Sequence, residues 1–252
     1  MKNILKSAIA TSLLISAGAY ADISQIKEAI NVSGQTRAYS QTLAVAYINK
    51  CFNSKKTSQL EQVMSTMDRT WIDLSNYEPV KGSKELTAAT KAMASEWSTY
   101  KTLLASECSK DNAKKVYVES DNFGSNADTY VSTLQKAIGK SAGAKLVNQA
   151  GRQRFYIMAI AKYNEMARAG LISDADAGSK IESIKTKWLQ SQKELKAQTA
   201  GKPEIDEILD TATTHFKNVV QNLHKRDGSL DVMFDSLYDI VNQQVRMFEA
   251  IE

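Results

Sequence analysis

The chain has 252 residues, in which 32 lysines and arginines face 28 aspartates and glutamates. Its formal net charge of +4 is small and the two signs are mixed along the chain, so neither a nucleic-acid-binding surface nor a polybasic membrane patch is indicated. Only two prolines interrupt a sequence rich in Ala, Lys, Gln, Glu, Leu and Met, which are good helix formers. We therefore expect an all-α protein.

The first 21 residues have the pattern of a secretory signal peptide. Lys2 and Lys6 flank the start of an apolar run that ends in Ala19-Tyr20-Ala21. This run is far shorter than the roughly 20 apolar residues of a membrane-spanning helix, and no later stretch is apolar for long enough either. We expect residues 1–21 to be removed, which takes two lysines away and leaves a periplasmic chain of net charge about +2 with no membrane insertion.

The first half of the mature chain predicts four helices, at 23–52, 59–76, 84–108 and 112–138. Ser83 is a candidate N-cap, and Lys81-Gly82 breaks the chain before it.

The second half repeats this plan. Gly170 is expected to close its first helix, Ser173 to cap its second and Pro203 to open its third. Asp227-Gly228 marks the turn into the fourth helix. Each half therefore predicts an up-down-up-down four-helix bundle.

A repeat at an offset of 117 positions relates the two halves. Six identical pairs share this spacing: Asn31 and Asn148, Gly34 and Gly151, Arg37 and Arg154, Tyr39 and Tyr156, Ala44 and Ala161, Trp71 and Trp188. We interpret the pairs as a tandem duplication with domains at 22–139 and 140–252. Because the linker at 137–145 is short and lacks proline, we expect a nearly continuous helix across it, with the two bundles stacked end to end.

One charge in each copy falls on the face expected to be buried. At the spacing of a helix bundle, the inward stripe of each first helix passes through Arg37 or Arg154, one turn after Gly34 or Gly151. A guanidinium withdrawn from water needs an anion beside it, because burying it unpaired costs several kcal/mol. That anion is either a bound ligand or an internal carboxylate, for which the first copy offers Glu96, Glu119, Asp121 and Asp128.

The stretch "INVSGQTRAYSQTLA", from Ile30, resembles the first-helix signature of a known sensor family. The family comprises the periplasmic domains of nitrate/nitrite sensor histidine kinases and of type IV pili methyl-accepting chemotaxis transducers (NarX/PilJ-like domains). "VNQAGRQRF", from Val147, resembles the same signature. The matching residues become candidate ligand contacts: Asn31, Gly34, Arg37, Ser40, Gln41, Asn148, Gly151, Arg152 and Arg154.

The resemblance implies a sensory bundle that binds a small anionic or polar solute, nitrate-like by analogy, and is accessory to a membrane signalling or pilus system. The partners it implies are a membrane receptor and a second copy paired through the first helices. The sequence departs from the signature in copy 2, where Ile157 and Met158 replace polar residues. The competing hypothesis is a structural or partner-binding envelope protein without a small-molecule ligand.

Cys51 and Cys108 are the only cysteines, and the ends of the first and third helices of an up-down-up-down bundle meet at one pole. Because export favours oxidation, we expect a disulfide between them.

No nucleophile or phosphate-binding motif is present, and His215 and His224 are nine positions apart, off the spacing of metal ligands on one helix face. We therefore expect no enzymatic activity, metal or cofactor. Trp71 and Trp188 are expected in the core.

Overall fold

The computed structural model describes residues 23, 25–52, 58–225 and 228–251, and the predicted signal peptide lies outside these residues. The described residues of the first half form α1 (Ile26–Phe52), α2 (Ser58–Asn76), the single turn α3 (Glu78–Lys81), α4 (Lys84–Leu104) and α5 (Lys110–Ile138). Those of the second half form α6 (Ala142–Arg168), α7 (Asp174–Gln198), α8 (Pro203–Gln221) and α9 (Ser229–Glu249). The predicted all-α class is confirmed.

Local signals in the sequence explain most helix ends. The hydroxyl of Ser83 accepts a hydrogen bond from the backbone N–H of Leu86, and Ser173 caps α7 in the same way. Gly170 follows α6 with a φ of 64°, a left-handed conformation that favours glycine. The third helix is shorter than expected, because Ser109 caps α5 and residues 105–109 form a loop before it.

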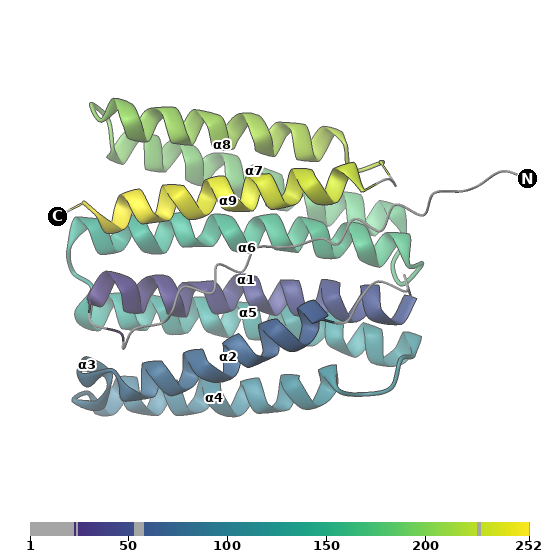
Figure 1. Cartoon of the computed structure of the whole chain (residues 1–252), viewed down its shortest axis with the longest axis horizontal. Helices are drawn as coiled ribbons and strands as arrows, with labels where there is room; N and C mark the ends of the chain where they lie inside the picture. Colours follow the sequence, from purple (N-terminus) through teal and green to yellow (C-terminus); the bar gives the residue numbers. More distant parts are fainter. Residues whose placement is uncertain (1–22, 24, 53–57, 226–227, 252) are drawn as a thin grey trace, which may run out of the picture.

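The helices pack as two groups of four. In the first group α1, α2, α4 and α5 follow one another around a bundle, and in the second group α6, α7, α8 and α9 do the same (Figure 1). The turn at 139–141 joins the groups, and it lies at the boundary expected between the two copies.

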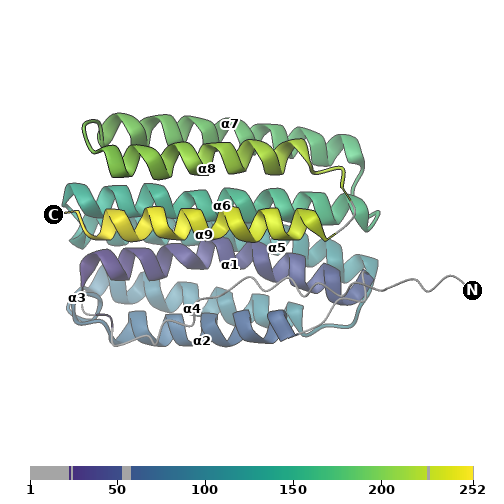
Figure 2. The ribbon, with the colours of Figure 1, turned by 45° about the horizontal axis from the view of Figure 1, so that its top comes forward.

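The expected end-to-end stacking of the bundles is wrong. Helix α6 lies beside α1 and runs in the same direction, so the bundles meet side by side (Figure 2). The nearly continuous helix expected at 137–145 is interrupted, because α5 ends before Gly139 and Ser141 caps a new helix that returns along α1. A Cβ at Gly139 would overlap Cδ1 of the buried Ile30 and lie 3.2 Å from the Gln135 backbone, so close packing at this turn favours glycine.

Side-by-side packing places α1 and α6 at the centre of the molecule. Every residue of α1 from Thr36 to Ile48 is buried, and between Gly143 and Met166 of α6 only Lys145 is exposed. A helix in contact with one bundle alone keeps a polar outer face, whereas these two helices are covered on all sides. The surface of α1 through which a second copy would pair is therefore occupied by α6 of the same chain.

The two expected core tryptophans are buried. Trp71 packs edge-on against Phe123 and Tyr130, with ring centroids 6.3 and 5.5 Å away. Trp188 stacks on Phe216 at 4.0 Å in the second bundle.

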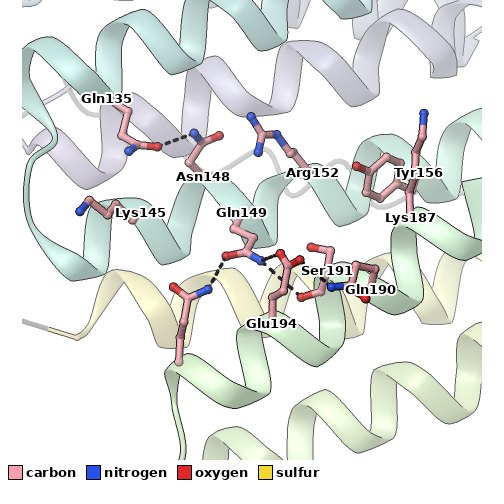
Figure 3. A pocket seen from close by; sticks show the side chains of 11 residues that line it. Gln135, Lys145, Asn148, Gln149, Arg152, Tyr156, Lys187, Gln190, Ser191 and Glu194 are labelled. Carbon is pink, nitrogen blue, oxygen red and sulfur yellow. Dashed lines mark hydrogen bonds between the residues drawn. The ribbon is translucent and has the colours of Figure 1, made fainter.

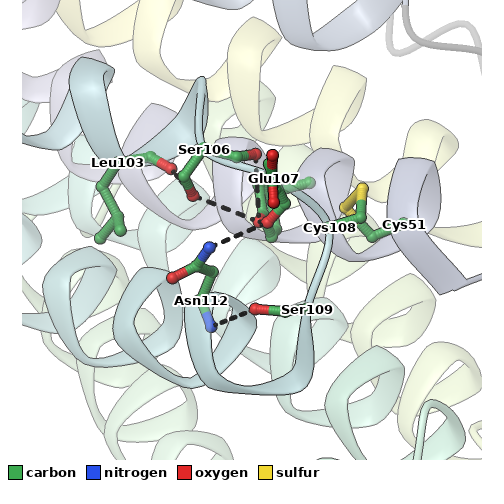
Figure 4. Close-up of a disulfide and its surroundings, with 8 residues drawn as sticks. Cys51, Leu103, Ser106, Glu107, Cys108, Ser109 and Asn112 are labelled. Carbon is green, nitrogen blue, oxygen red and sulfur yellow. Dashed lines mark hydrogen bonds between the residues drawn. A yellow bond between two sulfur atoms is a disulfide. The ribbon is translucent and has the colours of Figure 1, made fainter.

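A disulfide joins the C-terminal end of α1 to the loop after α4. Cys51 and Cys108 are bonded, with their Cα atoms 5.2 Å apart, which is the pairing expected from the sequence (Figure 4). Nearby, the hydroxyl of Tyr47 donates a 2.8 Å hydrogen bond to the carbonyl of Glu107. This pole of the first bundle is therefore held by a covalent and a polar link.

We predict that replacing both cysteines by serine lowers the free energy of unfolding by about 4 kcal/mol, because the bridge closes a loop between residues 57 positions apart. Urea unfolding of the variant and of the oxidised and reduced wild type measures this loss. A variant as stable as the oxidised wild type would contradict the prediction.

Candidate functional site

The Gly-x-x-Arg motif of the first copy places a guanidinium between two helix backbones. The Arg37 side chain turns back along α1, and its Nε donates a 3.2 Å hydrogen bond to the carbonyl of Gly34. A Cβ at Gly34 would lie 2.8 Å from Nη2 of Arg37, and one at Gly151 would lie 3.0 Å from the same atom. The two glycines of the repeat thus leave room for one guanidinium between α1 and α6.

Arg37 is 1 % exposed and its charge has an internal partner. Its Nη1 donates to Asp128 Oδ1 of α5 at 2.5 Å and to Asn148 Oδ1 of α6 at 2.9 Å, and Nη2 donates to the Asn148 carbonyl at 3.3 Å. Burial lowers the pKa of Arg37 to about 10, against the opposing effect of Asp128, so the group stays charged at neutral pH. Asp128 is one of the four carboxylates that the sequence offers for this role.

Arg154 occupies the equivalent position in the second copy and is 2 % exposed. Its Nη1 donates to Asn31 Oδ1 at 2.7 Å, and its Nε donates to Asn242 Oδ1 of α9 at 2.6 Å. Asn31 in turn donates to Glu249 Oε1 at 2.6 Å. Each motif arginine therefore binds the motif asparagine of the other copy, so the two copies meet through the same residues.

Asp128 serves a second arginine as well. Arg152 Nε and Nη2 donate to its two oxygens at 2.8 and 3.2 Å, so one carboxylate holds two guanidinium groups. Burial alone would raise the pKa of Asp128, but the Arg152 hydrogen bond and the charges of Arg37 and Arg152 outweigh it and lower the pKa. We call Arg37, Arg154, Asn31, Asn148, Arg152 and Asp128 the arginine seam.

Ser40 and Gln41 do not belong to the seam. The Ser40 hydroxyl donates to the Arg37 carbonyl at 2.7 Å, and Gln41 Nε2 donates to the carbonyl of Ser120 at 2.7 Å. Both side chains are buried between α1 and α5 and belong to the first bundle. Seven of the nine candidate residues thus come together and these two lie apart.

A polar groove of about 510 Å³ opens beside the seam, between the end of α5, α6 and α7 (Figure 3). It is lined by Gln135, Lys145, Asn148, Gln149, Arg152, Tyr156, Lys187, Gln190, Ser191, Glu194 and Gln198.

The groove carries more positive than negative charge. Glu194 accepts hydrogen bonds from Gln149 at 3.0 Å and from Gln190 at 2.8 Å. Lys145 and Lys187 make no ion pair within the described residues. Asn148 and Arg152 belong to both the groove and the seam, so a molecule in the groove would touch Asn148, which binds Arg37, and Arg152, which shares Asp128 with Arg37.

Sequence reasoning missed a third buried cation, Lys162 of α6. Its Nζ donates to Asp121 Oδ1 at 2.6 Å and lies against the rings of Tyr117 and Tyr163. Asp121, another of the carboxylates that the sequence offers to Arg37, pairs with this lysine instead. Lys162 lies eight positions after Arg154, two helical turns away, which is the signal that could have identified it.

A comparison with known protein families finds a match in the first bundle. Residues 22–122 match the model of the N-terminal domain of type IV pili methyl-accepting chemotaxis transducers, PilJ. This segment is therefore similar to the N-terminal domain of these transducers. The match includes α1 to α4 and part of α5, and so contains Asn31 and Arg37. No curated protein and no solved structure matches the chain.

The segment that is similar to this transducer domain is helical, and its motif arginine lies at a contact with a second four-helix bundle. No described helix is both long and apolar enough to cross a membrane.

We predict that Asp128→Asn lowers the free energy of unfolding by about 3 kcal/mol, because two guanidinium groups lose their only shared carboxylate. We place the effect at the lower end of the range for broken buried pairs because Asp128 is 39 % exposed. The loss should become smaller at acid pH. The pKa of Asp128 is lower in the folded protein than its unfolded-state value of 3.8, so the ionised carboxylate stabilises the fold above pH 3.8. This stabilisation disappears as the pH falls through the folded-state pKa.

Urea unfolding measures both effects. Glu182→Gln, which breaks an exposed pair with Lys185 on α7, is the control and should cost less than about 1 kcal/mol. Equal losses in the two variants would show that the seam carboxylate has no special role.

Proposed function

We propose that the chain is an exported sensory-type protein that binds a small anionic or polar solute and serves a membrane signalling or pilus system as an accessory. The support is the similarity of residues 22–122 to the PilJ transducer domain, together with a signal-peptide pattern at residues 1–21. In this proposal the chain binds and does not catalyse.

The second bundle takes the role that a partner subunit would have in a homodimer. The first helices of the two copies run side by side, and their equivalent residues exchange hydrogen bonds, Arg37 with Asn148 and Arg154 with Asn31. A symmetric interface between two subunits uses the same surface twice, and here the duplication supplies both surfaces in one chain.

The single observation that carries the binding proposal is the positively charged groove joined to the seam. Arg37 and Arg154 are buried and bonded to protein groups, so the solute contacts Arg152, Asn148 and Lys187 in the groove. An anion near Arg152 competes with Asp128 for its guanidinium, and Asp128 also holds Arg37. Binding in the groove would therefore change the contact between the bundles, which is what a sensory protein requires.

We predict that nitrate, nitrite, another small anion or an amino acid stabilises the wild type by about 2.7 kcal/mol at 100 times its dissociation constant. Arg152→Ala and Lys187→Ala should reduce this stabilisation, because both remove a positive charge from the groove. Lys193→Ala removes an exposed lysine of α7 that lies outside the groove, and this variant should keep the full stabilisation by the solute.

The stabilisation is measured by thermal unfolding of the wild type and of each variant with each of these solutes. A wild type that no solute stabilises would overturn the binding proposal.

A second function is favoured by the internal pairing of Arg37. Because Asp128 and Asn148 already satisfy its guanidinium, the seam also fits a purely structural contact in an envelope protein that binds a protein partner. The solute panel separates the two functions, since this alternative predicts no stabilisation by any small anion.

We predict that the mature protein is a monomer in solution, because α6 covers the surface of α1 that would pair with a second copy. Sedimentation equilibrium measures the mass. A stable dimer at micromolar concentration would contradict the proposal that the duplication replaces a homodimer.

A further inference from the structure

The two bundles are related more closely in structure than the six identical pairs suggest. Eight buried positions of α5 correspond to eight buried positions of α9 at an offset of 114: Val116 and Leu230, Ser120 and Phe234, Phe123 and Leu237, Gly124 and Tyr238, Ala127 and Val241, Tyr130 and Gln244, Val131 and Val245, Leu134 and Phe248. The same offset equates Asp128 with Asn242, and each binds the motif arginine of its own bundle. Equivalent positions in the two halves can therefore be compared directly.

One side of the contact between the bundles contains a complete charge pair. Lys162 of α6 reaches across to α5 of the first bundle, where its Nζ is 2.6 Å from Asp121 Oδ1 and 3.1 Å from Ser120 Oγ. The lysine is fully buried, and Tyr163 also donates to Asp121, at 3.1 Å. This contact connects the bundles through a satisfied ion pair.

The equivalent contact on the other side lacks the lysine. The offsets of 117 and 114 place Val45 of α1 where Lys162 stands and Asp235 of α9 where Asp121 stands. Val45 and Asp235 both line a small cavity of about 40 Å³, and Oδ1 of Asp235 is buried with no hydrogen-bond partner among the described residues. At roughly 10–15 Å³ for each water, the cavity has room for about three or four waters.

The charged groups that the structure describes around Asp235 are acidic. On α9 itself Asp231 and Asp239 lie one turn before and after it, and on α6 the neighbour is Glu165, which is paired with Arg168. The groups that α1 and α2 contribute are the amides Asn49 and Gln59, and on α8 His215 contacts the adjacent Ser236. Among the described residues that line the cavity, none is a cation.

We propose that Asp235 is a proton-dependent switch in the contact between the bundles. With Asp235 protonated, α9 packs against α1 beside Val45. With Asp235 ionised, the charge on its half-buried carboxylate, whose Oδ1 is buried, draws water into the cavity and loosens α9, while Lys162 and Asp121 hold the opposite side. The switch does not depend on the binding of a solute in the groove.

Burial and the charges of Asp231 and Asp239 raise the pKa of Asp235 to about 7. Because the folded-state pKa is above the unfolded-state value of 3.8, the folded protein binds the proton more tightly, and this stabilisation is lost as pH rises through about 7. Burial lowers the pKa of Lys162 to about 8, and because Asp235→Asn keeps this lysine, its titration near pH 8 is common to the wild type and this variant.

The experiment compares the full mature chain with Asp235→Asn, Val45→Lys and the control Asp210→Asn, which removes an exposed carboxylate from α8 of the same bundle. Urea unfolding between pH 5 and 8 gives the folding equilibrium constant. The folding equilibrium constant of the wild type, divided by that of Asp235→Asn, should fall by up to about tenfold per pH unit between pH 5 and about 7. Asp210→Asn should follow the wild type.

Amide hydrogen exchange of residues 229–249, corrected for intrinsic rates, locates the change. Exchange should be faster at pH 8 than at pH 6 in the wild type and equal at the two values in Asp235→Asn. Val45→Lys supplies the missing ammonium and should also remove the difference. Parallel pH profiles of the wild type and Asp235→Asn, in stability or in exchange, would overturn the proposal whether or not Val45→Lys folds.

Discussion

The arginine seam is the interaction on which the arrangement of this molecule depends. A buried guanidinium is tolerated only where hydrogen-bond acceptors and a negative charge surround it. Arg37 meets that requirement only when α5 and α6 both lie against α1, because Asp128 comes from one helix and Asn148 from the other. The same guanidinium therefore connects the core of the first bundle to the second bundle.

The duplication is symmetric in its backbone and asymmetric in its chemistry. Arg37 has a carboxylate partner, whereas the corresponding position opposite Arg154 is the amide Asn242. Lys162 has Asp121, whereas Asp235 faces Val45. Two bundles with one packing plan thus acquired different electrostatic environments at equivalent positions, and among the described residues Oδ1 of Asp235 is left without a hydrogen-bond partner.

Sequence patterns predicted the helices and their caps because those depend on local interactions. Ser83, Ser173 and Pro203 act within one turn of their own positions, so a single sequence is enough to interpret them. The motif glycines and arginines could also be predicted to lie inside. The way the bundles meet could not, because it depends on a tight turn at Gly139 and on contacts between residues more than a hundred positions apart.

The central claim is that Gly34 and Gly151 let the Arg37 guanidinium lie between α1 and α6, and glycine-to-alanine substitution tests it most directly. In an open helical position this change stabilises a protein by up to about 1 kcal/mol, and Gly178 of α7, where an added Cβ would have no neighbour within 4 Å, should show that gain. At Gly34 the new methyl group would press on a guanidinium held by Asp128 and Asn148, so urea unfolding should show a loss of stability. A gain at Gly34 equal to that at Gly178 would contradict the account.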